Sequence, residues 1–114
     1  MKLIGIWLTS LVLFAQVNAT VGGTVADTTG ALIPGVEITA RNLATGIVTT
    51  RITNEAGNYD FASLQPGVYI VSASLSGFQT ATYNNVQLSQ AQQVRLNFTL
   101  QVGTVAQAVE VVAV

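Results

Sequence analysis

Hydrophobic and polar residues alternate along several short stretches of this chain. The alternation is clean over residues 36–42 and 69–75, and clearest over residues 94–100. A period of two residues is typical of a β-strand that buries one face. Turn-forming clusters of Gly, Pro, Asn and Asp separate these stretches about every 8 to 12 residues, the spacing of β-sandwiches and barrels. No helical stripe follows Thr20, so the pattern predicts an all-β sandwich of about seven strands.

The stretch from Thr53 to Leu75 is the predicted centre of the fold. It contains a polar loop closed by Gly57, a short strand, a corner at Pro66-Gly67 and a long strand. Burial of each large inward side chain contributes about 1.5 to 3 kcal/mol to stability. The inward set predicted from all strands is Val36, Ile38, Ala40, Tyr59, Phe61, Tyr69, Val71, Ala73, Leu75, Phe78, Val94, Leu96, Phe98 and Leu100.

Four local features carry expectations about position. Gly22 and Gly23 weaken the first strand, which we therefore expect near a sheet edge. Glu37 and Arg51 are expected on one outer face, where an exposed ion pair contributes less than ~1 kcal/mol. Residues 27–30 form a predicted turn in which Asp27 caps its own backbone. The polar stretch 79–86 is also expected at an edge.

The first 19 residues have the pattern of a signal peptide. Lys2 precedes an apolar run of about a dozen residues, and small residues stand at Val17 and Ala19, where a signal peptidase reads the chain. The run is shorter than the roughly 20 residues that span a bilayer. We expect cleavage after Ala19, with a retained anchor as the alternative. Residues 20–101 then form the domain, and residues 102–114 a connector or an extra edge strand.

Charge and composition narrow the classes of partner. The chain of 114 residues has room for one domain and is 50% hydrophobic. Without the signal peptide, the chain contains three arginines and five carboxylates, which gives a net charge of −2. No basic face results, so nucleic acid is not an expected partner. The chain has no cysteine, so its fold depends on the apolar core and not on disulfides.

The sequence also argues against an enzyme. It contains no histidine and no cysteine, which excludes Ser-His-Asp, Cys-His and histidine-based zinc chemistry. A hydrolase with two carboxylates would need both in one cleft, and turns or solvated strand faces account better for the acidic residues. We predict no catalytic residue, no metal site and no cofactor.

Two stretches remain as candidate binding sites. Tyr83, with Asn84 and Asn85, is the one aromatic residue that the alternation does not clearly bury, and an aromatic beside amides is typical of carbohydrate recognition. A tyrosine packed at an edge is the alternative. The apolar tail is the second candidate, because it could pair with a partner by strand addition. Its proposed partner-strand residues are Val109, Glu110, Val111 and Val112.

Several ordered motifs resemble one known family. These are Gly23-Thr24-Val25-Ala26-Asp27 with Gly30, Pro34-Gly35-Val36, residues 53–61, residues 64–69, and Ser76-Gly77-Phe78. Together they resemble the carboxypeptidase regulatory-like domain over about residues 21–100. The resemblance implies a transthyretin-like Greek-key β-sandwich and an accessory domain without catalytic activity.

The resemblance also implies a cellular context. In bacteria such a module is similar to the N-terminal extension of many TonB-dependent outer-membrane receptors, and the tail resembles the connector to their plug domain. We therefore expect an exported accessory or interaction domain, in the periplasm or at the outer membrane. Its partner would be another protein or a downstream plug and barrel. The alternative is a carbohydrate-binding module of the periplasm or cell surface, an analogy that rests on shared fold alone.

Overall fold

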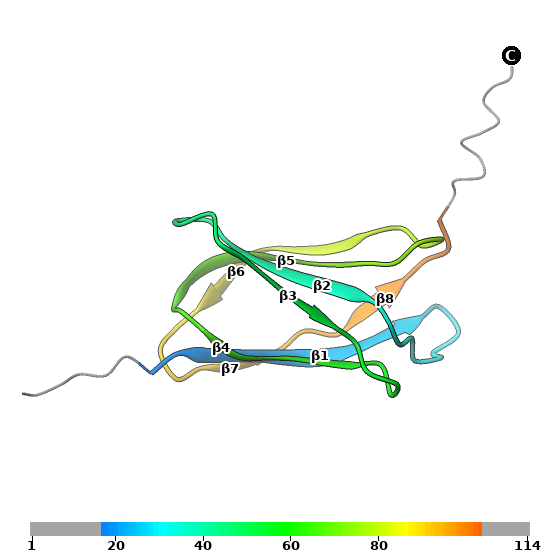
Figure 1. The fold of residues 1–114 in the computed structure, drawn as a ribbon, viewed down its shortest axis with the longest axis horizontal. Helices are drawn as coiled ribbons and strands as arrows, with labels where there is room; N and C mark the ends of the chain where they lie inside the picture. The colour runs from blue at the N-terminus through cyan, green and yellow to red at the C-terminus, as the bar shows by residue number, and fades with distance from the viewer. Residues whose placement is uncertain (1–16, 104–114) are drawn as a thin grey trace, which may run out of the picture.

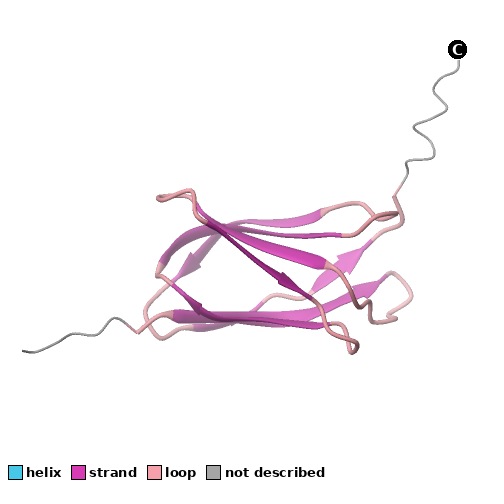
Figure 2. Ribbon diagram, in the orientation of Figure 1, coloured by secondary structure: helices cyan, strands magenta, loops and turns pink. Residues whose placement is uncertain are grey.

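The computed structural model describes residues 17–103, which form a sandwich of two β-sheets (Figures 1 and 2). All regular structure in these residues is strand. The eight strands are β1 (Ala19–Asp27), β2 (Glu37–Asn42), β3 (Val48–Ile52), β4 (Asn58–Leu64), β5 (Gly67–Ser74), β6 (Ala81–Leu88), β7 (Gln93–Arg95) and β8 (Phe98–Leu100). The predicted all-β sandwich is confirmed.

Each sheet contains four strands. One has the order β4-β1-β7, with β8 pairing further along β1, and the other has the order β3-β2-β5-β6. All pairings are antiparallel except those of β7 and β8, which run parallel to β1. The polar stretch expected at an edge is β6, which is indeed an edge strand.

The last predicted strand is divided into two, which raises the count from about seven to eight. Between β7 and β8, the Leu96 amide donates to the Gly22 carbonyl (2.9 Å). The Asn97 side-chain oxygen accepts a hydrogen bond from the Thr24 amide (2.9 Å). At Thr24 a side-chain oxygen thus takes the place of a backbone carbonyl, so one alternating stretch becomes two short strands along the same neighbour.

The first strand lies in the centre of its sheet, so the prediction that it lies near an edge is wrong. β1 pairs with β4 on one side and with β7 and β8 on the other. Gly23 allows the Leu96 carbonyl to approach so closely that an added Cβ would overlap it. Glycine in β1 therefore marks a close approach of two backbones and not a weak edge strand.

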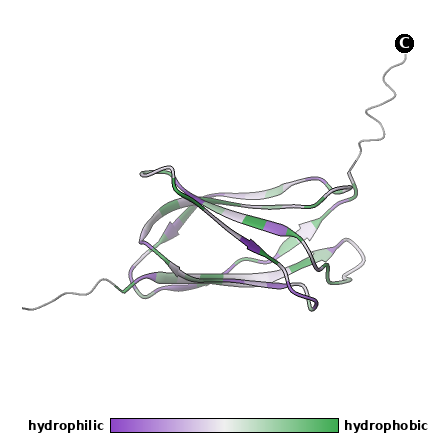
Figure 3. Cartoon of the chain, viewed as in Figure 1, coloured by the Kyte–Doolittle hydropathy of each residue, from purple (hydrophilic) through white to green (hydrophobic). Residues whose placement is uncertain are grey.

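The core lies between the two sheets and follows the predicted alternation. Figure 3 shows hydrophobic and hydrophilic residues interspersed along the strands. Phe61, Ile38, Leu100 and Val71 are among the largest fully buried side chains. Leu75, Phe78, Val94 and Leu96 are partly buried and pack against this core. The buried set is Ala19, Val21, Val25, Val36, Ile38, Ala40, Tyr59, Phe61, Leu64, Tyr69, Val71, Ala73, Leu88, Phe98 and Leu100.

Arg51 does not share an outer face with Glu37, contrary to the expectation. Arg51 pairs with Ile38, whose side chain is fully buried, whereas Glu37 pairs with Ile52. Residues directly opposite in a pair point to the same face, so Arg51 points toward the open side of the sandwich. Its guanidinium carbon lies 5.7 Å from the centroid of the Phe61 ring on β4, within the range of a cation–π contact.

The structure includes three residues of the predicted signal peptide. β1 begins at Ala19, which is fully buried and pairs with Leu64. The Asn18 side-chain amide donates to the Ser63 hydroxyl (2.7 Å), and the Val17 carbonyl accepts a hydrogen bond from the Ala91 amide (3.0 Å). The expected cleavage point after Ala19 therefore lies within a paired strand. Residues 1–16 lie outside the described part of the chain.

Candidate functional site

Tyr83, the predicted aromatic of a ligand site, lies on the edge strand β6 and is 39% exposed. Its hydroxyl donates to the Asn97 carbonyl oxygen (2.5 Å). Its ring meets the Phe98 ring edge-on, with centroids 5.0 Å apart. Tyr83 thus links β6 to the segment between β7 and β8, across one side of the sandwich. Its hydroxyl and one side of its ring are occupied by contacts within the protein.

Asn84 and Asn85 form a β-bulge beside it. Tyr69 pairs with Val86 and Val71 pairs with Tyr83, so the two asparagines lie opposite the single residue Ile70. Asn85 has a φ of 56°, in the left-handed region that asparagine tolerates better than most residues. Both asparagines are exposed. Asn84 and Asn85 therefore serve to form the bulge in the backbone of β6. The other predicted site residues lie outside the described part of the chain: Val109, Glu110, Val111 and Val112.

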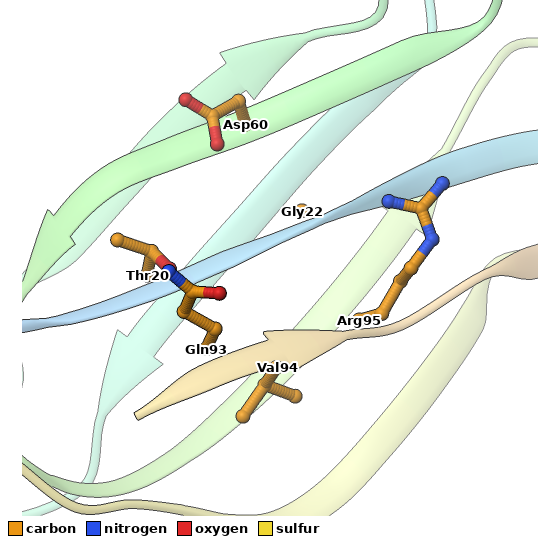
Figure 4. A pocket seen from close by; sticks show the side chains of 6 residues that line it. All are labelled: Thr20, Gly22, Asp60, Gln93, Val94 and Arg95. Atoms are coloured by element: carbon orange, nitrogen blue, oxygen red, sulfur yellow. The ribbon is translucent and has the colours of Figure 1, made fainter. Parts of the chain in front are cut away.

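A second candidate site is a shallow hollow on the outer face of the other sheet (Figure 4). Its volume is about 360 Å³, near the lower end of the range for small-molecule sites. Three strands contribute to it: β1, β4 and β7. Its lining residues are Thr20, Gly22, Asp60, Gln93, Val94 and Arg95.

Strand register explains how these residues meet. Gly22 pairs with Asp60 on one side and with Arg95 on the other, so the three form a row across the sheet. Thr20 pairs with Gln93 two residues earlier, on the same face. Because Gly22 has no side chain, the middle of the row is bare backbone, and Figure 4 shows Asp60 and Arg95 on opposite sides of it.

The hollow offers both kinds of hydrogen-bonding group. The Asp60 carboxylate accepts hydrogen bonds and the Arg95 guanidinium donates them, while Thr20 and Gln93 can do both. The two charges are opposite, so the site has no net charge. No group of three His, Cys, Asp or Glu residues within residues 17–103 could hold a metal ion. This site could not be predicted from the sequence, because its residues come from three separate stretches that only the strand register brings together.

The buried tyrosine Tyr59 is a structural group. Its hydroxyl donates to the Leu96 carbonyl oxygen (2.5 Å). Burial raises the pKa of Tyr59 well above its usual value, because the phenolate would lose its hydration. The hydroxyl therefore stays protonated at neutral pH and is held by an internal acceptor, which is unsuited to a nucleophile or a general base. Within residues 17–103, no helix is long and apolar enough to cross a membrane.

Comparison with solved structures shows the fold in several proteins. A candidate carbohydrate-binding protein from Bacteroides uniformis has a TM-score of 0.60 at 19% identity, over 74% of this chain and 41% of that one. Another, from Pseudomonas aeruginosa, has a TM-score of 0.53 at 15% identity, over 74% and 89%. Chlorocatechol 1,2-dioxygenase from Pseudomonas putida has a TM-score of 0.56 at 13% identity, over 75% and 61%.

These likenesses establish the architecture and no more, because one fold hosts unrelated functions. This chain spans less than two thirds of the Bacteroides protein and of the dioxygenase. No curated protein sequence matches it. The family of carboxypeptidase regulatory-like domains, however, matches residues 20–101. This match covers most of the chain and agrees with the two-sheet sandwich, so the protein belongs to the carboxypeptidase regulatory-like domain family.

Proposed function

We propose that this protein is a non-catalytic interaction domain, exported from the cytoplasm and working as the accessory part of a TonB-dependent receptor-like outer-membrane protein. The sequence provides no histidine or cysteine for catalysis, and the buried hydroxyl of Tyr59 is already hydrogen-bonded within the fold. The pattern of residues 1–19 supports export. The receptor context is supported by the family membership and by the apolar tail after the sandwich.

The exposed edge strand β3 is the observation that supports an interaction role best. Among the described strands it pairs only with β2. Natural edge strands usually have charged residues that prevent pairing with another chain. In β3 the single charged residue, Arg51, points toward Phe61, while Val48 and Ile52 are 53% and 57% exposed. An extended segment of a partner protein, or of a downstream plug, could add beside β3 through main-chain hydrogen bonds.

Size and location of the native product test the receptor context. Envelope fractions would be separated and probed with an antibody against the sandwich. A large outer-membrane product is expected. A small product in the periplasm would overturn the receptor context and leave a free-standing exported module.

A photo-crosslinking residue at Thr50, in the middle of β3, tests the interaction edge. The matched control places the same residue at Thr82 on β6, the opposite edge of the same sheet. We expect an adduct with a specific protein, or with the downstream part of the same polypeptide, from position 50 only. Equal adducts from both positions, or none from position 50, would contradict a role for β3.

Carbohydrate binding is the second candidate function. The hollow around Gly22 supports it, because a carboxylate, a guanidinium, an amide and a hydroxyl are the groups that recognise sugar hydroxyls. Two of the similar structures are candidate carbohydrate-binding proteins. Titration with oligosaccharides tests this function. No binding by the wild-type protein would exclude it for those sugars.

A further inference from the structure

We propose that the hollow formed by Thr20, Gly22, Asp60, Gln93 and Arg95 binds a neutral glycan by its adjacent hydroxyl groups, and that Tyr83 takes no part. This inference rests on the second proposed function and names the class of ligand that the hollow would bind. The row Asp60-Gly22-Arg95 comes from strand pairing on both sides of β1. Its geometry is therefore fixed by backbone hydrogen bonds and not by a mobile loop.

The charges of the row favour a neutral ligand. Asp60 and Arg95 lie on opposite sides of a bare backbone floor, and both are exposed. An anion beside Arg95 would be repelled by the Asp60 carboxylate, and a cation beside Asp60 would be repelled by the Arg95 guanidinium. A sugar hydroxyl both donates and accepts, so adjacent hydroxyls can donate to Asp60 and accept from Arg95. Thr20 and Gln93 extend the same set along the sheet.

The shape of the hollow favours a ring that lies flat. An added side chain at Gly22 would meet the Tyr59 carbonyl oxygen at 3.2 Å and the Asp60 carboxylate at 3.5 Å, so glycine keeps the floor clear. The volume of about 360 Å³ suits a ligand of about one or two sugar rings, since small-molecule sites begin near 300 Å³. No aromatic side chain lines the hollow. Weak binding is expected, with a Kd of about 1 mM or more.

Tyr83 is unsuited to the stacking role because its contacts are internal. Its hydroxyl is bonded to Asn97 and its ring meets Phe98. It lies on β6 in the other sheet and is not among the residues that line the hollow.

The test is an NMR titration of the ¹⁵N-labelled protein with cellohexaose and maltohexaose, with alanine as a zwitterionic probe. The variants are Asp60→Asn, which keeps size and removes the charge, and Arg95→Gln, which replaces the guanidinium with a shorter neutral amide. Their matched controls are Glu37→Gln and Arg41→Gln, exposed residues on β2 in the opposite sheet. Tyr83→Phe is the third control.

We expect at least one oligosaccharide to shift the amide signals of Thr20, Gly22 and Asp60. Each hollow variant should weaken that binding about tenfold, the effect of losing one hydrogen bond to a charged group. The three controls should bind like wild type. Binding that the hollow variants leave unchanged would overturn this site while carbohydrate binding stands. A response to alanine alone would overturn the glycan assignment. No response to either oligosaccharide would overturn both this inference and the function on which it rests.

Discussion

Gly23 lies against the Leu96 carbonyl so closely that the space between them could not hold a methyl group. A Cβ built on Gly23 would overlap that carbonyl and also lie 2.9 Å from the Asn97 side-chain oxygen. On either side of this contact, the Leu96 amide bonds to Gly22 and the Thr24 amide bonds to Asn97. The break between β7 and β8 is therefore built around the absence of a side chain in the central strand.

Replacing this glycine should destabilise the protein strongly. We expect Gly23→Ala to lower the free energy of unfolding by about 3 kcal/mol, the upper end of the range for overpacked sites. The contact is with backbone, which cannot turn aside as a side chain would. Urea denaturation measures the loss.

Gly46→Ala is the matched control for this substitution. Gly46 has a φ of 78° and nothing within 4 Å of its added Cβ, so its cost is that of left-handed backbone alone, about 1 kcal/mol. A Gly23→Ala protein no less stable than Gly46→Ala would show that the β7–β8 segment yields to the methyl group.

Tyr83 is expected to stabilise the closure between the two sheets. Tyr83→Phe removes the hydrogen bond to Asn97 and should cost about 1 kcal/mol. Tyr83→Ala also removes the contact with Phe98 and should cost about 2 kcal/mol in total. Thermal unfolding of the two variants separates the two contributions. If Tyr83→Phe is as stable as wild type, the hydroxyl contributes nothing to folding.

The position of the mature N-terminus should affect stability. A chain that begins at Thr20 lacks the buried Ala19 side chain, the Asn18–Ser63 bond and the Val17–Ala91 bond. We expect it to be about 2 kcal/mol less stable than a chain that begins at Val17. Urea denaturation of the two chains measures this difference, and equal stability would show that residues 17–19 are dispensable.

Mass spectrometry of the exported product would give the native N-terminus. The signal-peptide pattern predicts Thr20. A product that begins before Val17 would show that cleavage leaves β1 whole, and would contradict the predicted cleavage point.

The turn at Asp27 should make stability depend on pH in the acid range. The Thr29 hydroxyl donates a hydrogen bond to the Asp27 carboxylate at 2.6 Å, and this bond is the main cause of a pKa of Asp27 below its ordinary value of 3.8. Hydrogen bonds from the Thr29 and Ala31 amides lower the pKa further. Because the pKa of Asp27 is lower in the folded than in the unfolded protein, its ionised carboxylate stabilises the fold above pH 3.8. This stabilisation is lost as the pH falls through the folded pKa. Asp27→Asn should therefore have a lower Tm than wild type at pH 7, with a gap that narrows below pH 3.8.

Thr29→Val tests the cause of that dependence. It removes the hydroxyl donor and keeps the carboxylate, so its Tm should fall less steeply in acid than that of wild type. A wild-type pH profile in Thr29→Val would show that the hydroxyl does not hold the pKa down.

The local sequence pattern was sufficient to predict most of the core. Alternation identified Tyr59, Phe61 and Phe98 as inward residues, and each is buried. It also predicted the turn at Asp27 and the edge position of β6. These features depend on neighbours within a few residues, because strand period and turn chemistry are local properties of the chain.

Features that depend on pairing between distant strands could not be predicted in this way. The sequence alone determined which residues of the core strands point inward, the turn at Asp27, and the lack of histidine and cysteine chemistry. The tertiary structure decided that β1 is central, that Arg51 faces Phe61, and that Tyr83 bonds to Asn97. It also placed Asp60, Gly22 and Arg95 in one row. The physical reason is that register and sheet order are set by contacts between residues far apart in the chain, and a period of two residues contains no information about which strands become neighbours.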